Sequence, residues 1–128
     1  MEIKFDCKEK EMIIKNLLTI LIEIIRSRNE IENSKFADTQ FIDELNIEIK
    51  KYKELISFIS INFKYVNISD DDVIKLISSC WVTIIKQEQR IRKITNNKIF
   101  YNNKEKEIKS MRYEIDSCFK LLEKVRGE

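Results

Sequence analysis

The stretch that decides the fold is MIIKNLLTILIEII, which spans residues 12–25. Ten of its 14 residues are apolar, and Ile14, Leu17, Leu21 and Ile24 recur at the three- and four-residue spacing of one helix face. The other faces are largely apolar too, and such a helix is buried on several sides. The stretch is too short, and too often interrupted by polar residues, to span a bilayer. We therefore expect a buried helix in a soluble protein.

Three further segments repeat apolar residues at the same helical spacing. Asp38 or Thr39, Ser69 and Asn102 precede them, and short polar side chains cap helices by accepting hydrogen bonds from free backbone N–H groups. The chain has no proline and a single glycine, Gly127, so nothing inside it forces a break or a tight turn. The predicted helices span about 8–32, 38–63, 70–95 and 102–126.

The predicted connections are short and cover about 33–37, 64–69 and 96–102. Short connections between long helices make neighbouring helices antiparallel. A chain of 128 residues has the length of one domain. We expect residues 1–128 to form a single all-α domain, an antiparallel up-down four-helix bundle with coiled-coil-like packing.

The composition argues against most catalytic chemistry. The chain has no histidine, which removes histidine-based acid–base and nucleophilic catalysis and most zinc enzymes. A single glycine cannot build a phosphate-binding loop. Asp70, Asp71 and Asp72, with Glu44 and Glu48, have the oxygen ligands that Mg²⁺ prefers, but we favour a role for the aspartates at the start of a helix, where they complement its dipole. We expect no enzyme activity, no cofactor and no metal.

The three cysteines, Cys7, Cys80 and Cys118, are an odd number and show no paired spacing. This usage is typical of reduced thiols in a cytoplasmic protein. Cys80 and Cys118 fall on apolar stripes, so we expect them to fill the core. The charged N-terminus does not resemble a secretory signal.

The positive charge is concentrated in one segment. Residues 86–112 contain nine Lys or Arg and three acidic residues, while the whole chain carries a net charge of only +2. An antiparallel hairpin brings the end of the third helix and the start of the fourth to one tip. This basic tip is expected to comprise Arg90, Arg92, Lys93, Lys98, Tyr101, Lys104, Lys106 and Lys109. Such a tip binds phosphates and stacked bases, binds an acidic protein surface, or is merely solvated.

Apolar residues also exceed what one small core needs, since a bundle helix requires about three in seven. A surplus on a soluble domain usually forms a self-association or partner surface. The candidate interface residues are Trp81, Ile85, Ile20 and Phe58. The alternative is a thick core around the first helix.

The leading functional hypothesis is a non-catalytic protein-interaction module that binds a partner protein. We also expect it to form a homodimer and not to contact a membrane. Isoleucine, lysine and asparagine abound over alanine and glycine, which indicates an A+T-rich genome. An inhibitor of a host system encoded by a phage or mobile element, such as an anti-CRISPR, or an immunity or antitoxin-type protein, fits this size and composition. The alternative is a sequence-tolerant nucleic-acid-binding protein that uses the basic tip, directly or on a nucleoprotein target.

Overall fold

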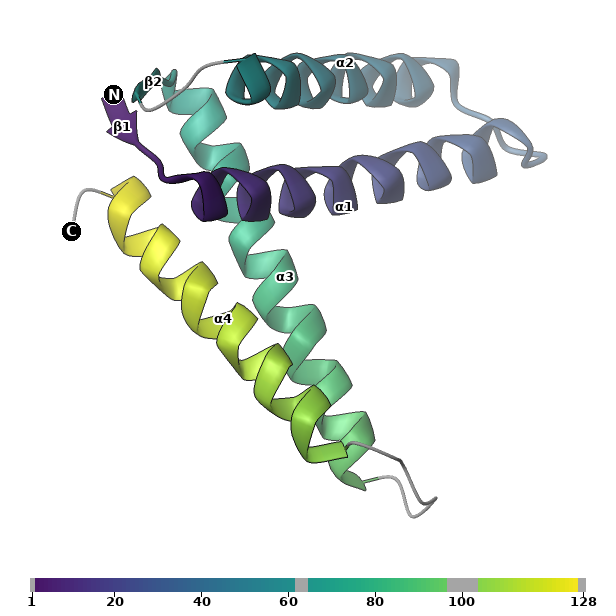
Figure 1. Ribbon diagram of the computed structural model, residues 1–128. Coiled ribbons are helices and arrows are strands. Elements are labelled where there is room, and N and C mark those ends of the chain that lie inside the picture. The colour runs from purple at the N-terminus through teal and green to yellow at the C-terminus, as the bar shows by residue number, and fades with distance from the viewer. Residues whose placement is uncertain (1, 62–64, 97–103, 127–128) are drawn as a thin grey trace.

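The chain forms four long helices and two short strands, as the computed structural model shows for residues 2–61, 65–96 and 104–126 (Figure 1). The elements follow one another as β1 (Glu2–Lys4), α1 (Cys7–Glu32), α2 (Thr39–Ile61), β2 (Tyr65–Asn67), α3 (Asp70–Asn96) and α4 (Lys104–Arg126). The predicted all-α fold of four helices is confirmed, and each helix lies close to its predicted range. The second helix was predicted to end at Phe63 and the fourth to start at Asn102, and both positions lie outside the described residues.

Side-chain caps explain where the helices begin. Asp6 and Glu9 form a capping box at the start of α1, in which Asp6 Oδ1 accepts from the Glu9 backbone N–H at 2.8 Å. Asp38 caps α2 by accepting from two backbone N–H groups, and Ser69 Oγ accepts from the Asp72 N–H at 3.2 Å. The predicted caps at Asp38 and Ser69 are confirmed, whereas the cap at Asp6 was not predicted.

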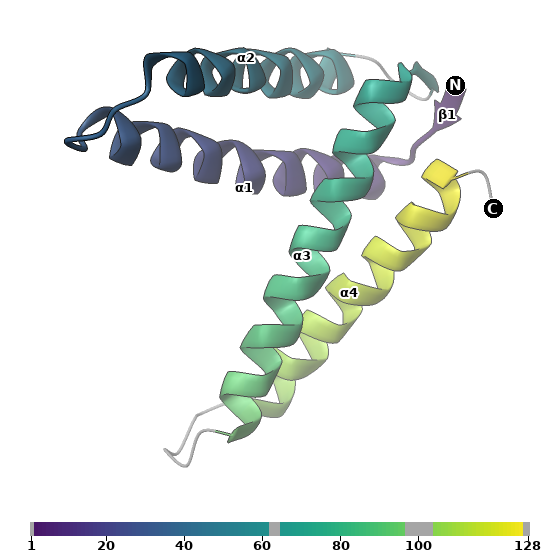
Figure 2. The same cartoon turned by 180° about the vertical axis from the view of Figure 1, so that it is seen from behind.

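The helices form two antiparallel hairpins that cross each other. α1 packs against α2, α3 packs against α4, and α1 also packs against α3. The α3–α4 hairpin runs steeply away from α1 and α2, so the hairpins meet only near the start of α1 (Figures 1 and 2). Antiparallel neighbours were predicted within each hairpin; the crossing between hairpins was not. The crossing exposes more helix surface than four aligned helices would.

The two strands close the end where the hairpins meet. β1 pairs antiparallel with β2 in the register Glu2 to Asn67, Ile3 to Val66 and Lys4 to Tyr65. The side chains of Ile3, Phe5 and Ile68 are buried in the common core. Neither strand was predicted: β2 falls in the predicted connection 64–69, which is wrong for these residues, and no element was predicted before residue 8.

The buried faces differ in part from the predicted stripes. Leu55 and Leu76, which belong to the apolar surplus of the second and third helices, are both buried. Ile14 and Ile24, predicted on the main stripe of α1, are only partly buried. The reason for α1 is that it packs against both α2 and α3, so its buried face is divided between two neighbours. The core also holds five polar side chains, Asn16, Lys75, Ser79, Thr83 and Gln87.

Asn16 joins three helices through hydrogen bonds in the core. Its Oδ1 accepts from Thr83 Oγ1 of α3 at 2.8 Å, and its Nδ2 donates to Cys118 Sγ of α4 at 3.7 Å. A buried polar group is costly unless it is hydrogen-bonded. These bonds therefore favour one position and one rotation of α1 against the α3–α4 hairpin.

Phe5→Ala is expected to lower the free energy of unfolding by about 3–5 kcal/mol, because it leaves a cavity where β1 joins the core. Phe36→Ala is the matched control, since that ring is 90% exposed and its loss should change stability by no more than about 0.5 kcal/mol. Urea unfolding followed by circular dichroism measures both. Equal stability of the two variants would contradict the placement of Phe5.

Thr83→Val is expected to cost about 1–3 kcal/mol, because it leaves the Asn16 carbonyl oxygen without its partner. The double variant Asn16→Leu/Thr83→Val should lose less stability than the two single variants added together, since it removes both polar groups. A double-mutant cycle in urea measures the difference. Strict additivity would show that the pair does not interact.

Candidate functional site

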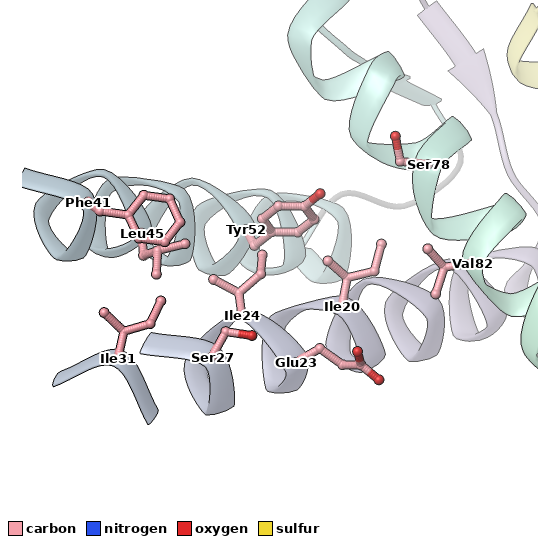
Figure 3. Close-up of a pocket in the computed structure, with 10 residues that line it drawn as sticks. All are labelled: Ile20, Glu23, Ile24, Ser27, Ile31, Phe41, Leu45, Tyr52, Ser78 and Val82. Carbon is pink, nitrogen blue, oxygen red and sulfur yellow. The ribbon is translucent and has the colours of Figure 1, made fainter. Parts of the chain in front are cut away.

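An apolar groove lies in the corner between the first hairpin and α3. It has a volume of about 590 Å³, and Figure 3 shows the side chains that line it. α1 contributes Ile20, Ile24, Ser27 and Ile31 along one wall, and these positions span about three helical turns, or roughly 16 Å. α2 forms the opposite wall and α3 closes one end. The lining residues are Ile20, Glu23, Ile24, Ser27, Ile31, Phe41, Leu45, Tyr52, Ser78 and Val82.

The groove has few polar lining residues, and its one carboxylate, Glu23, is paired with a lysine. The Glu23 carboxylate contacts the Lys86 ammonium, and this hydrogen bond lowers the pKa of Glu23. Burial, reinforced by the nearby Glu48 carboxylate, raises the pKa of Tyr52, so its phenol stays neutral near pH 7. At the outer end Phe41 is 45% exposed. The groove therefore offers apolar surface with few polar groups, which suits apolar side chains better than a charged ligand.

The four predicted interface residues lie on three separate surfaces. Trp81 and Ile85 lie four residues apart on α3 and are both exposed, with Trp81 in edge-to-face contact with Phe119 of α4 at 5.8 Å between ring centroids. Ile20 lines the groove. Phe58 lies on α2, beside a smaller cavity. The structure thus pairs Trp81 with Ile85 but does not join them to Ile20 or Phe58.

The sequence analysis missed part of these surfaces. Phe41 and Leu45 in the groove, and Phe119 beside Trp81, were not among its candidates. Phe41 is the third residue of α2, and its place in the chain does not show whether the ring faces the core or a groove. Phe119 directly follows the core residue Cys118, and only the position of α3 reveals that it meets Trp81.

The described part of the basic tip gathers cations from two helices. Arg90, Arg92, Lys93, Lys106 and Lys109 are exposed, and none of the salt bridges within the described ranges involves them. Lys104 is half-buried and donates to the Thr95 carbonyl at 3.5 Å, which ties the start of α4 to α3. Lys98 and Tyr101 lie outside the described residues.

A second cluster of charges lies between the start of α1 and α4, and its members compensate one another. Lys15 Nζ lies 3.1 Å from Glu114 Oε1, and Lys124 Nζ lies 2.5 Å from Glu9 Oε1. Gln87 also donates to Glu114 at 2.6 Å. These contacts join α1 to α4, and in each of the two salt bridges one lysine neutralises one glutamate.

The acidic cluster at the start of α3 lies beside basic residues. Asp71 and Asp72 line a cavity of about 280 Å³ together with Lys51 and Lys75, and Glu48 forms a salt bridge with Lys51 at 3.7 Å. Within the part of the chain that the structure describes, no group of three or more His, Cys, Asp or Glu side chains is arranged to hold a metal ion. The aspartates occupy the first turn of α3, where they complement the helix dipole.

Cys80 and Cys118 lie in contact between α3 and α4, and both are fully buried. The hydrogen bond to Cys118, together with burial, raises the pKa of the Cys80 thiol well above its ordinary value. A buried, protonated thiol is a poor nucleophile. The prediction that both cysteines fill the core is confirmed, and Cys7 is exposed.

Compared with known proteins, the chain matches no family model, no curated protein sequence and no solved structure. None of the helices in the described ranges combines the length and apolarity that a membrane span requires. The features of the molecule that bear on its function are the groove, the exposed face of α3 and the basic tip.

Proposed function

We propose that this protein is a non-catalytic binding module that holds an apolar helical segment of a partner protein in the groove between α1, α2 and α3. The observation that supports the proposal is the shape and chemistry of that groove. It follows α1 for about three turns, is mostly apolar, and is open at Phe41. An amphipathic helix lays its apolar side chains into grooves of this kind at a spacing of three and four residues.

The cations of the basic tip fit the same proposal. Arg90, Lys93 and Lys106 are exposed and have no salt-bridge partner among the described residues. Uncompensated surface charge steers an oppositely charged partner and accelerates encounter. The size and composition of the chain led us to expect an inhibitor that occupies the surface of its target. That function is a narrower form of the same proposal.

Phe41→Asp is expected to abolish capture of the partner protein, because it places a charge at the open end of the apolar groove. Phe36→Asp is the matched control, since Phe36 is exposed and does not line the groove. The tagged proteins are incubated with lysate of the source cells, with and without nuclease, and bound protein is identified by mass spectrometry. We expect a stoichiometric protein that survives nuclease, is lost with Phe41→Asp and is retained with Phe36→Asp.

Two results would overturn this proposal. One is capture that Phe41→Asp leaves unchanged, which would place the binding surface elsewhere. The other is recovery of nucleic acid alone, lost on nuclease treatment.

The basic tip supports a second candidate function, sequence-tolerant binding of nucleic acid. Lys106 lies in the first turn of α4, where the helix dipole disfavours a cation, and Lys93 lies at the end of α3 on the same tip. Phosphate contacts release counterions, so this binding weakens steeply as salt rises.

For this second candidate, Lys93→Glu/Lys106→Glu is expected to weaken binding of a single-stranded DNA oligonucleotide and to flatten its salt dependence. Two lost phosphate contacts should reduce the slope of log K against log salt by about 1.4. Lys53→Glu/Lys120→Glu makes the same charge change on exposed lysines away from the tip. Fluorescence anisotropy across a salt series measures both. Equal weakening by the two pairs would remove the tip as a specific site.

A further inference from the structure

One face of α3 is apolar, exposed and covered by no other helix. Ile74, Trp81 and Ile85 all lie on it and are exposed, and Trp81 contacts Phe119 at its edge. Thr83, which lies two residues from both Trp81 and Ile85, points to the other side of the helix and bonds to Asn16 of α1. α1 therefore covers the opposite face of α3. Figure 2 shows α3 in front, with no element over it.

The same face carries charges at its two ends, Asp70 at one end and both Glu88 and Arg92 at the other. Asp70 and Arg92 are both exposed, and each lies eleven residues from Trp81, at the first and the last part of α3 respectively. Eleven residues make about three turns, so the three side chains lie nearly in line along the helix. Asp71 and Asp72 reinforce the acidic end.

This pattern is complementary to itself in one orientation. If two α3 helices pack antiparallel with Trp81 at the centre, Asp70 of each lies opposite Arg92 of the other. Ile85 then lies opposite Ile77, which is partly buried against the core of its own copy. A parallel arrangement would place Asp70 against Asp70 and Arg92 against Arg92, which is repulsive. An interface between identical copies about a two-fold axis requires such a self-complementary surface.

We propose that this face of α3 is the interface of a homodimer, in which the two α3 helices pack antiparallel about Trp81 and Asp70 of each copy pairs with Arg92 of the other. The tryptophans supply the apolar centre, as aromatic residues do in the desolvated centre of interfaces. The charge pairs lie at the rim and select the antiparallel register. The groove proposed to bind the partner protein adjoins this face at Ser78 and Val82. The two proposals are tested by substitutions on different helices, Phe41 on α2 and Ile85 on α3, so their outcomes can be distinguished.

The apolar centre is tested by Ile85→Lys, with Ile47→Lys as the matched control. The two isoleucines are equally exposed, at 53% and 55%, and Ile47 lies on α2. Sedimentation velocity of the purified protein over a concentration series measures the dimer dissociation constant. We expect a concentration-dependent dimer that Ile85→Lys abolishes and Ile47→Lys leaves unchanged. Circular dichroism checks that both variants keep their helices.

The antiparallel register is tested by exchanging the charges. Asp70→Lys or Arg92→Glu alone replaces two attractive pairs with two repulsive ones and should weaken the dimer roughly tenfold, the scale expected for exposed ion pairs. The double variant Asp70→Lys/Arg92→Glu restores both pairs with their signs reversed and should recover most of the affinity. Loss of helix stability cannot mimic this recovery, because both substitutions oppose the dipole of α3. High salt should reduce the differences.

Three results would overturn the proposal. The first is a wild-type protein that remains monomeric at tens of micromolar. The second is a dimer that Ile85→Lys does not disrupt, which would place the interface elsewhere. The third is a double charge exchange that fails to recover affinity lost in the single variants, which would exclude this register. None of these results bears on capture of a partner protein through the groove.

Discussion

The structure depends on the buried contact of Asn16 with Thr83 and Cys118. Asn16 is 1% exposed and is surrounded by apolar side chains of α1, α3 and α4, where an amide without partners would cost several kcal/mol. Its hydrogen bonds are made only when α1 lies across the α3–α4 hairpin at one height and one rotation. Apolar packing alone would tolerate small shifts of α1, since methyl groups have no fixed partners. The polar contact therefore decides where the hairpins cross.

Both candidate surfaces follow from that crossing. Four aligned helices would turn every apolar face inward, and the excess of isoleucine would make a thick core. Because the hairpins meet at one end only (Figure 1), the corner beside Ile20 and Val82 stays open as a groove. The face of α3 that carries Trp81 also has no helix over it. The apolar surplus noted in the sequence is thus divided between a core around Leu17 and Leu76 and two exposed surfaces.

Much of the fold could be predicted because its signals are local. Asp38 and Ser69 cap their helices through backbone groups two or three residues away, so neighbouring residues suffice to locate the cap. Which apolar residues are buried could not be predicted, because a helix with apolar residues on several sides does not reveal which side a neighbour will cover. Leu55 and Leu76 are buried, whereas Phe58 and Ile85 are exposed. The strands were missed for a related reason. β1 and β2 have three residues each, too few for a periodic pattern, and they pair only because the fold brings both chain segments together.

The amino-acid sequence by itself determined that the protein is all-α, how many helices it has, that Asp38 and Ser69 cap two of them, and where positive charge accumulates. Each of these follows from residues within a few turns of one another along the chain. Only the tertiary structure decided that the hairpins cross, that Ile20 lines a groove while Trp81 lies on a different face, and that the cations of the tip have no acidic neighbours within bonding distance in the described residues. These properties depend on the relative rotation of whole helices, which long-range contacts such as the one between Asn16 and Thr83 set.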